Sequence, residues 1–590
     1  MLLSIRDLNV HFHTPDGDVH AVKNVSLDIA ESACLGVVGE SGSGKSQLFL
    51  AAMGLLAANG RASGSVKYRG VEILGAPQKR LNSLRGSKMT MIFQDPLTSL
   101  TPHMTIGDQI VEALALHHKM PRGEAAARAR EVLDYVRIPE AARRMKQYPH
   151  ELSGGMRQRV MIAMATITGP DLLIADEPTT ALDVTVQAQI LEILKLLKRD
   201  KKTAIALISH DMGVIAGTAD QVQVMRHGEV VEQGPVDDIF YAPKQPYTQM
   251  LLAAMPRVAK GAVPPPTLTG DALLEVRDLK VSFPVPQGFL RKAKELRAVD
   301  GVSFTLHQGE TLGVVGESGC GKSTLARAIL QLLPSDAGAV VWLGRDLSRE
   351  TREEIRGARK NFQIVFQDPL ASLDPRQPIG VSIAEPLKAL IPGLSQNEIR
   401  GKVRGMMDKV GLDPGWINRY PHELSGGQNQ RVGIARAMIV EPRMVVCDEA
   451  VSALDVSIQA QIVALLKDIQ AETGLSLIFI SHDLSVVRQL AHRVMVLYLG
   501  RIVEMADAGA LYADPRHPYT RALLSAVPTP DPRAERAKTR VLLTGDMPSP
   551  LDRRAQLTFL KSKRIEDPEA EQYRPQLIEV VPGHFVAEHD

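Results

Sequence analysis

The stretch VGESGSGKS, residues 38–46, returns as VGESGCGKS at residues 315–323. Each copy follows a short apolar run typical of a buried strand, and the first leads into a helical pattern at 47–57. Both fit G-x-x-x-x-G-K-[ST], whose glycines let backbone N–H groups surround phosphate oxygens. Chance would supply such a match roughly 0.02 times in a chain of this length, so two copies predict two phosphate-binding loops.

The side chains of each loop have separate expected tasks. Lys45 and Lys322 should reach the β- and γ-phosphates of a nucleotide, and the hydroxyls of Ser46 and Ser323 should hold Mg²⁺. The following helix points its positive end at the same phosphates. The predicted nucleotide-binding residues of the two loops are Gly39, Ser41, Gly42, Gly44, Lys45, Ser46 and Gln47, and Gly316, Ser318, Gly319, Gly321, Lys322, Ser323 and Thr324.

Other motifs are duplicated in the same order. FQDPLTSL at 93–100 returns as FQDPLASL at 366–373, YPHELSGG at 148–155 returns at 420–427, and ISHD at 208–211 returns at 480–483. The offset between copies falls only from 277 residues at the lysines to 272 at the last pair, which indicates duplicated domains. We predict domains at 1–256 and 273–530, a proline-rich linker at 257–272, and an extension at 531–590 without a counterpart in the first copy.

Carboxylates follow an apolar run in each copy. DLLIADEP at 171–178 and MVVCDEA at 444–450 are typical of buried parallel strands up to their acidic pairs. A charged pair there needs a cation or hydrogen-bond donors. We expect Asp176 and Asp448 to join the Mg²⁺ site, and Glu177 and Glu449 to act as general bases toward the attacking water. Strand and helix patterns together predict an α/β fold with a helical subdomain inserted in each copy.

Composition argues against some classes of protein. Lys and Arg total 69 against 67 Asp and Glu, a balance that does not favour a nucleic-acid-binding protein. No apolar run approaches the ~18–20 residues that span a bilayer, and Arg6 and Asp7 interrupt the place of a signal peptide's apolar region. We therefore expect a cytoplasmic protein that meets a membrane only through partners. The three cysteines, Cys34, Cys320 and Cys447, are expected to be buried thiols rather than disulfide or metal ligands.

The order of motifs resembles that of the ATP-binding cassette (ABC) ATPase family over nearly all of both copies: phosphate loop, FQDP loop, LSGG, strand with Asp-Glu, ALD and a SHD histidine. The resemblance implies two tandem ABC nucleotide-binding domains of the P-loop NTPase type, packed head to tail around two ATP molecules with Mg²⁺. Each phosphate loop would then face the LSGG turn of the other copy. The further residues it implies are Gln94 and Gln367 at the metal and water, Ser153, Gly154, Gly155, Ser425, Gly426 and Gly427 at the nucleotide, and His210 and His482 in catalysis.

Some features leave alternatives open. Ser209, His210 and Asp211 are consecutive, and adjacent residues do not normally form a hydrolase triad, so without the other motifs this tripeptide would rather cap a helix. Phe12 and Phe283 could stack on adenine or could pack in the core. The copies differ at Gln47 against Thr324, at Arg157 against Asn429, and at Pro178 against Ala450. None of these changes removes a catalytic group, so we expect two active sites.

The particular motifs resemble the fused ATPases of bacterial oligopeptide, dipeptide and nickel importers, including those of glutathione and microcin C type. That resemblance implies a peripheral protein on the cytoplasmic face of the inner membrane, with two permease subunits and, through them, a solute-binding protein as partners. The family's C-terminal extension carries iron–sulfur cysteines in several members, but residues 531–590 contain no cysteine. A tandem-ABC translation factor would need a long charged linker, and a DNA-repair ATPase would need zinc-binding cysteines or a coiled-coil insertion, neither of which this sequence contains.

Overall fold

The computed structural model describes residues 1–15, 17–95, 99–118, 120–180, 182–255, 272–286, 293–452, 454–541, 548–549, 551–562 and 573–590. The predicted linker lies outside these residues except for Ala272. The chain divides into two compact units. The first contains the chain up to residue 257 together with Asp455–Ser457 and 528–545, and the second contains the remainder.

The first unit has a central, mostly parallel sheet in the order β10-β9-β3-β8-β7-β6, whose edge strand β10 is antiparallel to β9. Its innermost strand β3 is buried along its whole length, as expected of a parallel strand covered on both faces. Its strands are β3 (Cys34–Val38), β6 (Met89–Ile92), β7 (Leu172–Asp176), β8 (Ala204–Ser209), β9 (Gln221–Arg226) and β10 (Glu229–Pro235).

A second, antiparallel sheet of this unit has the order β2-β1-β4-β5. Its strands are β1 (Leu3–Thr14), β2 (Gly17–Ile29), β4 (Gly60–Tyr68) and β5 (Val71–Glu72). The first helix, α1 (Lys45–Ala52), shares one buried apolar cluster with residues of both sheets. This helix is shorter than the sequence pattern predicts, because the chain turns at Gly54, whose φ is 65°.

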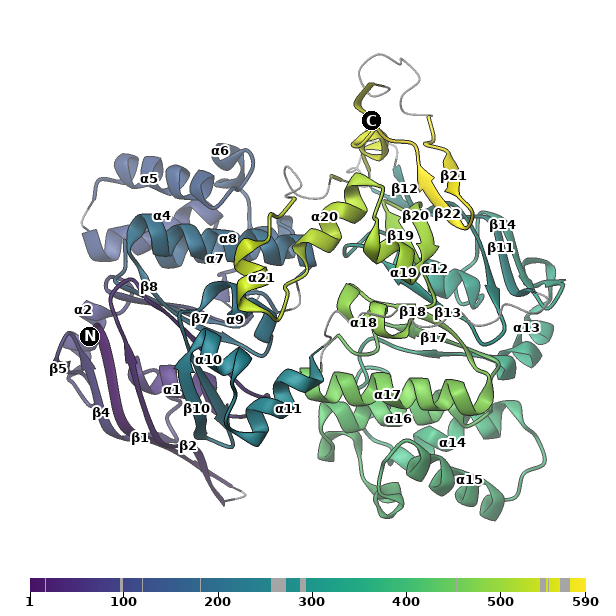
Figure 1. The fold of residues 1–590 in the computed structure, drawn as a ribbon, viewed down its shortest axis with the longest axis horizontal. Coiled ribbons are helices and arrows are strands. Elements are labelled where there is room, and N and C mark those ends of the chain that lie inside the picture. Colours follow the sequence, from purple (N-terminus) through teal and green to yellow (C-terminus); the bar gives the residue numbers. More distant parts are fainter. Residues whose placement is uncertain are drawn as a thin grey trace. The chain divides into compact units, whose positions relative to one another are not determined.

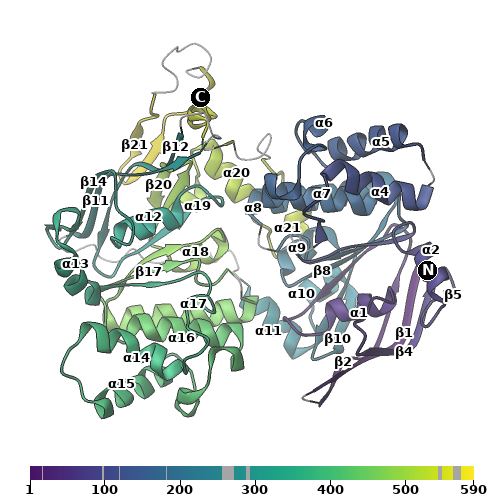
Figure 2. The same ribbon diagram turned by 180° about the vertical axis from the view of Figure 1, so that it is seen from behind.

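The predicted helical insertion is present between β6 and β7. Its helices α4, α5 and α6 gather beside α7 and away from the antiparallel sheet, as Figures 1 and 2 both show. Besides α1, the described helices of the unit are α2 (Gln78–Leu84), α4 (Ile106–His118), α5 (Arg122–Tyr135), α6 (Ala141–Arg144), α7 (Gly154–Thr166), α8 (Val184–Lys201), α9 (Met212–Thr218), α10 (Val236–Tyr241) and α11 (Pro246–Ala254), with α21 (Pro532–Ala537) packed on α9 and α10.

The second unit repeats this plan. Its antiparallel sheet has the order β12-β11-β14-β15, formed by β11 (Ala272–Val285), β12 (Lys294–His307), β14 (Ala337–Trp342) and β15 (Arg345–Asp346). Its helices are α12 (Lys322–Ile329), α13 (Arg352–Ala358), α14 (Ile379–Leu390), α15 (Gln396–Lys409), α16 (Gly426–Met438), α17 (Val456–Thr473), α18 (Leu484–Leu490), α19 (Ala508–Ala513) and α20 (Pro518–Ala526). Helices α14 and α15 form the insertion beside α16 (Figure 1).

The main sheet of the second unit is longer than that of the first, with the order β16-β17-β18-β13-β19-β20-β22-β21. Six of its strands match the first unit: β13 (Thr311–Val315), β16 (Phe362–Val365), β17 (Met444–Asp448), β18 (Ser476–Ile480), β19 (Arg493–Tyr498) and β20 (Arg501–Asp507). The other two, β21 (Leu577–Val581) and β22 (His584–Ala587), come from the extension, and β22 pairs antiparallel with β20. The extension therefore adds a hairpin to the edge of this sheet.

Two further predictions from the sequence concern the cysteines and membrane-spanning segments. The three cysteines are buried and free, and burial raises the pKa of Cys34 and of Cys447 to about 12. In the part of the chain that the structure describes, no helix is long and apolar enough to cross a membrane.

Candidate functional site

The first phosphate loop joins β3 to α1 and is shaped by its glycines. Gly44 has a φ of 91°, and a Cβ there would lie 2.3 Å from the carbonyl oxygen of Ala21. Gly39 is equally confined, because its Cβ would lie 2.2 Å from the Met225 carbonyl oxygen. Lys45 is buried, and its Nζ donates to the carbonyl oxygens of Gly39 and Glu40, at 2.8 Å each. Burial lowers the pKa of Lys45, because its ammonium group is poorly solvated there. A bound phosphate would supply the negative charge that this group lacks.

The second loop, between β13 and α12, has the same geometry. Gly321 has a φ of 105°, and its Cβ would lie 2.0 Å from the carbonyl oxygen of Ala298. The Nζ of Lys322 donates to the carbonyl oxygens of Gly316 at 2.7 Å and Glu317 at 3.0 Å. In both loops the tips, Ser41 and Gly42 or Ser318 and Gly319, are exposed, and Gln47 and Thr324 are half-buried.

Two of the three predicted metal ligands of each copy, the serine and the aspartate, meet directly, whereas the third, Gln94 or Gln367, donates to the neighbouring glutamate. Ser46 Oγ donates to Asp176 Oδ1 at 2.9 Å, and Ser323 Oγ donates to Asp448 Oδ1 at 2.9 Å. Burial raises the pKa of both aspartates despite these hydrogen bonds, so each carboxylate lacks full compensation for its charge. Hydroxyl and carboxylate oxygens are ligands that Mg²⁺ prefers, so the donor set fits this ion. Among the described residues no cluster of three or more His, Cys, Asp or Glu could hold a metal, but Mg²⁺ completed by nucleotide phosphates does not need one.

Glu177 lies at the end of β7 in a left-handed backbone conformation, with a φ of 46°. Such a conformation is costly for a non-glycine residue and is concentrated at functional sites. Three side chains surround its Oε2: Gln94 Nε2 donates at 2.9 Å, Thr180 Oγ1 donates at 3.0 Å, and His210 Nδ1 lies at 3.4 Å. The structure thus brings together three predicted residues of this copy and adds Thr180, which the motif comparison missed.

Glu449 has the matching position after β17, with a φ of 50°. Gln367 Nε2 donates to its Oε2 at 2.8 Å, and His482 Nδ1 lies 3.4 Å from the same oxygen. The residue that corresponds to Thr180 is Ser452, whose hydroxyl donates instead to the backbone carbonyl of Glu449 at 3.0 Å. The two carboxylates therefore differ by one hydrogen bond.

Burial opposes charge on each glutamate and on each histidine, yet their mutual attraction is stronger. Burial raises the pKa of Glu177, but the hydrogen bond and charge of His210, helped by Thr180 and Lys45, lower it overall, and the hydrogen bond and charge of Glu177 help to raise the pKa of His210. The pair Glu449 and His482 shifts in the same directions for the same reasons. Each glutamate is held ionised, as a base that accepts a proton from water requires.

The LSGG turns open helices in both copies. Ser153 caps α7 by accepting from the Met156 N–H at 3.2 Å, and Ser425 caps α16 by accepting from the Gln428 N–H at 3.3 Å. Both serines are exposed, and an exposed helix N-terminus suits an anion. Gly154 and Gly426 have room for a Cβ, whereas at Gly155 and Gly427 a Cβ would lie 2.5 Å from a branched side chain of the next helix.

The structure also shows the surroundings of Asn429, of Asp211 and of the two phenylalanines that could stack on adenine. Asn429 is buried and its amide donates to the carbonyl oxygens of Pro421 at 2.9 Å and Leu424 at 3.3 Å, which stabilises the backbone before the LSGG turn. Asp211 caps α9 through the Gly213 N–H at 2.7 Å, as the helix-cap alternative for the SHD tripeptide predicted. Phe12 and Phe283 are half-buried against the cores of their units.

Comparison with known proteins agrees with this geometry. The family model described as ABC transporter matches residues 22–180 and 299–452, and the model described as Oligopeptide/dipeptide transporter, C-terminal region, matches 231–276 and 503–555. The chain is 46% identical to the glutathione import ATP-binding protein GsiA of Salmonella choleraesuis (strain SC-B67), covering 99% of this chain and 96% of that protein. It is 45% identical to GsiA of Escherichia coli (strain K12), covering 100% of this chain and 97% of that protein.

These matches cover both copies and nearly the whole length of the relatives. The phosphate loops and the ionised glutamates lie inside the two ABC transporter matches, and the helices α11 and α20 lie inside the C-terminal-region matches. The chain therefore belongs to the ABC transporter family, as a tandem ATP-hydrolysing protein of the oligopeptide/dipeptide type.

Proposed function

We propose that this protein is the ATP-hydrolysing subunit of an importer at the bacterial inner membrane that takes up glutathione or a related short peptide. It would act from the membrane periphery on two permease subunits, which a solute-binding protein supplies. The observation that carries the proposal is that, in each cassette, the glutamate directly after the strand that ends in Asp176 or Asp448 accepts a hydrogen bond from Gln94 or Gln367. The solute itself rests on the relatives named GsiA.

In each cassette the chain's own residues divide the work of hydrolysis. Lys45 and Lys322 would neutralise charge on the β- and γ-phosphates, and Gln94 and Gln367 would orient the attacking water. Glu177 or Glu449 takes a proton from that water as its oxygen bonds to the γ-phosphorus and the bond to ADP breaks. The neighbouring His210 or His482 would hold the carboxylate in place. Mg²⁺, held by Ser46 and Asp176 or by Ser323 and Asp448, would neutralise charge on the phosphates when bound.

The arrangement of the cassettes stays a prediction of the family resemblance. It would place Ser153, Gly154 and Gly155 at the nucleotide on Lys322, and Ser425, Gly426 and Gly427 at the nucleotide on Lys45. Closure on ATP and opening after hydrolysis would then drive the permeases between two states. The rival functions, a translation factor or a DNA-repair ATPase, are not favoured, because the full-length relatives are import proteins.

The hydrolytic role is tested with Glu177→Gln combined with Glu449→Gln in the purified full chain. We expect at least about a hundredfold loss of kcat with ATP binding retained, because the amide fills the same space but accepts no proton. The matched control is Glu131→Gln, an exposed glutamate on α5. Persistent turnover in the double variant would exclude these residues as the bases.

The transport role needs a separate experiment. Cells that lack this protein but contain its genetically linked permeases should regain uptake of labelled glutathione with the wild-type chain and not with the double glutamine variant. Uptake of unrelated dipeptides, measured alongside, separates a glutathione importer from a general peptide importer. Failure of the wild-type chain to restore uptake of either class would refute the proposed solute class while leaving the ATPase assignment intact.

A further inference from the structure

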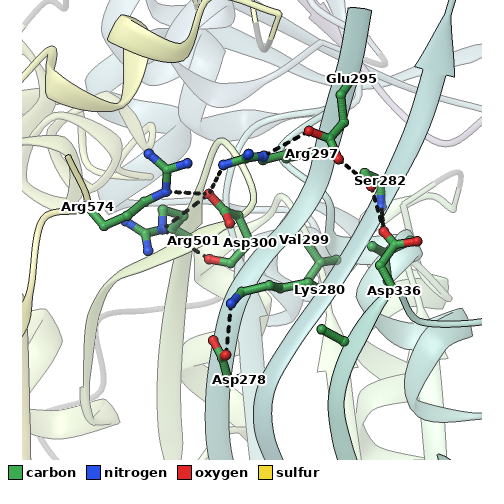
Figure 3. A pocket seen from close by; sticks show the side chains of 12 residues that line it. Asp278, Lys280, Ser282, Glu295, Arg297, Val299, Asp300, Asp336, Arg501 and Arg574 are labelled. Carbon is green, nitrogen blue, oxygen red and sulfur yellow. Dashed lines mark hydrogen bonds and ion pairs between the residues drawn. The ribbon is translucent and has the colours of Figure 1, made fainter. Parts of the chain in front are cut away.

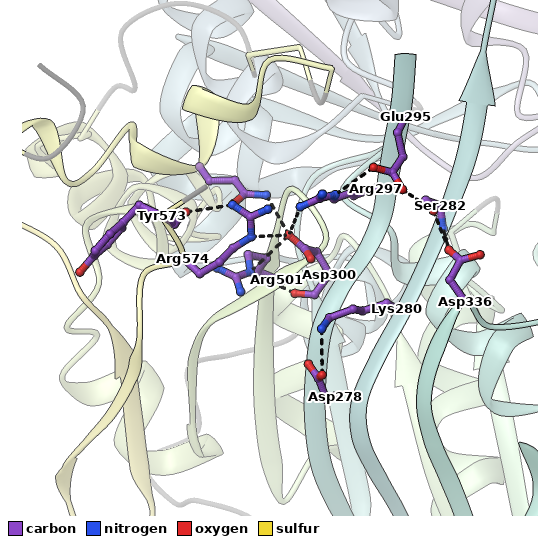
Figure 4. A network of polar contacts seen from close by, with 11 residues as sticks. Asp278, Lys280, Ser282, Glu295, Arg297, Asp300, Asp336, Arg501, Tyr573 and Arg574 are labelled. Atoms are coloured by element: carbon purple, nitrogen blue, oxygen red, sulfur yellow. Dashed lines mark hydrogen bonds and ion pairs between the residues drawn. The ribbon is translucent and has the colours of Figure 1, made fainter. Parts of the chain in front are cut away.

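Three groups of contacts, called anchors below, hold the extension that follows the second cassette against the second unit. The third anchor includes a residue that also contacts the phosphate loop. The first anchor is Asp300 on β12, whose side chain is 5% exposed. Arg574 Nε lies 3.1 Å from Asp300 Oδ2, and Gln556 Nε2 donates to the same oxygen at 3.3 Å. Figure 3 shows Arg574 beside this aspartate among the side chains that line a pocket at β11 and β12, and Figure 4 shows the surrounding ion pairs.

The first cassette has the opposite charges at this place. Lys23 corresponds to Asp300, because its N–H donates to the Gly228 carbonyl oxygen at 2.8 Å as that of Asp300 donates to Gly500 at 2.9 Å. Lys23 pairs with Glu229 at 3.6 Å, whereas Asp300 pairs with Arg501 at 3.8 Å. A lysine would repel Arg574, so this anchor suits the second cassette alone.

The second anchor is the added hairpin. Glu504 on β20 is fully buried, and His584 Nε2 lies 2.7 Å from its Oε1. The same carboxylate accepts from the backbone N–H groups of Arg516 at 2.8 Å and His517 at 2.9 Å, immediately before α20. In the first cassette Glu232 accepts likewise from Lys244 and Gln245, and among the described residues no histidine bonds to it. The hairpin therefore fixes the start of α20.

The third anchor is an aromatic cluster around Phe559. Its ring lies 5.4 Å from that of Tyr498, 5.1 Å from that of His517 and 6.1 Å from that of Tyr519. His517 Nδ1 accepts from the Tyr519 N–H at 3.1 Å, and burial lowers the pKa of His517 to about 3, which keeps that nitrogen available as an acceptor. In the first cassette Arg226 takes the place of Tyr498 and covers the ring of Tyr247 at 4.6 Å.

Tyr519 connects this cluster to the second phosphate loop. It is fully buried, and its hydroxyl accepts from the backbone N–H of Glu317 at 3.1 Å. The carbonyl of that same residue accepts from Lys322 Nζ at 3.0 Å. A shift of Tyr519 would therefore move the backbone that holds the phosphate-binding lysine. This contact joins two residues that are 202 positions apart in the sequence.

We propose that the C-terminal extension is a positioning element for the second ATP site: Phe559 and β22 hold Tyr519, and Tyr519 holds the phosphate loop through Glu317. The second site thereby depends on residues 554–562 and 573–590, and the first site does not. Tyr519 and Phe559 are positioning residues, since neither touches the reacting atoms. The consequence for nucleotide binding rests on the proposed function, whereas the structural link does not.

Hydrogen–deuterium exchange of the nucleotide-free full chain tests the link directly. Tyr519→Phe keeps the ring and removes the acceptor, so the peptide covering 315–323 should exchange about three- to tenfold faster, while that covering 38–46 is unchanged. Phe559→Ala should act in the same direction, and Phe559→Tyr should restore protection. Asp300→Lys with Arg501→Glu, which copies the first cassette's pair, should raise exchange in 573–590 and then in 315–323.

Nucleotide binding is measured with a fluorescent ATP analogue in two backgrounds. In Lys45→Ala, which leaves the second site, Tyr519→Phe and Phe559→Ala should each raise the Kd by about three- to tenfold. In Lys322→Ala, which leaves the first site, Phe559→Ala should leave the Kd unchanged. Equal effects on both loops or both sites, or unchanged exchange at 315–323 in Tyr519→Phe, would overturn the proposal.

Two further outcomes are distinct. If exchange responds as expected but the Kd of the second site does not, the extension does not position that site for nucleotide, and the proposal fails. If the Lys45→Ala chain binds no nucleotide before any further change, the proposed ATP site on Lys322 is wrong, while exchange still decides the link. Phe559→Ala that fails to fold leaves the decision with Tyr519→Phe, because that change keeps the buried volume.

Discussion

Nδ1 of His210 lies 3.4 Å from Oε2 of Glu177, and the second cassette repeats this relationship at His482 and Glu449 with the same 3.4 Å. Both histidines lie just after the strand that neighbours the strand before the glutamate in the main sheet. Each pair lies beside a phosphate-loop lysine, so the charge state of the pair affects both stability and catalysis.

The pH dependence of stability should report these pairs. The lowered pKa of each glutamate gives a contribution present above its unfolded value of about 4.3 and lost as pH falls through the folded value. The raised pKa of each histidine gives a contribution present below its unfolded value of about 6.5 and lost as pH rises through the folded value. Both contributions are complete only between these limits.

We therefore expect the difference in Tm between the wild type and His210→Gln with His482→Gln to be largest between about pH 4.5 and 6.5. Calorimetry across pH 4 to 9 measures it. His150→Gln, an exposed histidine of the first cassette, serves as the control. A difference that grows steadily above pH 7 would contradict a raised histidine pKa.

The hydrogen bond from Thr180 should affect the rate of ATP hydrolysis, whereas the hydrogen bond from Ser452 should not. Thr180 Oγ1 donates to the Glu177 carboxylate, whereas Ser452 Oγ donates to the Glu449 backbone. Thr180→Ala should change single-turnover hydrolysis at the first site about two- to fivefold, and Thr180→Ser should restore it. Ser452→Ala is the matched control for the second site. Equal responses at the two sites would show that the difference in hydrogen bonding has no catalytic consequence.

The glycine before each phosphate-loop lysine should be irreplaceable. Gly321→Ala would bring a Cβ to 2.0 Å from the Ala298 carbonyl oxygen at a φ of 105°, so it should destabilise the second cassette by about 1–3 kcal/mol or more. Gly433 in α16 has nothing within 4 Å of its Cβ position, so Gly433→Ala should stabilise by up to about 1 kcal/mol. Denaturant unfolding of both variants measures the two effects, and a stable Gly321→Ala chain would contradict the steric argument.

The pairing of the cassettes can be tested by replacing the serine of each LSGG turn. The family resemblance predicts that Ser153→Ala weakens nucleotide trapping on the cassette that contains Lys322 and spares the cassette that contains Lys45. Vanadate trapping with a photoreactive ATP, followed by cleavage between the cassettes, assigns the trapped nucleotide. Ser425→Ala should give the mirror-image result. Loss of nucleotide from the Lys45 cassette in Ser153→Ala would refute the head-to-tail pairing.

The sequence by itself determined the duplication, the α/β fold and the residues of each phosphate loop. These features are local: glycines, a lysine and a hydroxyl at fixed spacing shape one turn at a helix N-terminus, and apolar runs that end in Asp-Glu specify buried strands. The meeting of Ser46 with Asp176 and of Gln94 with Glu177 followed the same logic, because parallel strands bring their carboxyl ends to one edge of the sheet.

Only the tertiary structure decided the rest. The difference between Thr180 and Ser452 depends on where a hydroxyl points, which residue type alone does not specify. Two contacts join segments that are hundreds of residues apart: that of Tyr519 with Glu317 and that of Arg574 with Asp300. No spacing in the sequence predicts either contact. The Arg574 contact exists because the extension adds a hairpin to the edge of the sheet and covers a buried aspartate where the first cassette has Lys23.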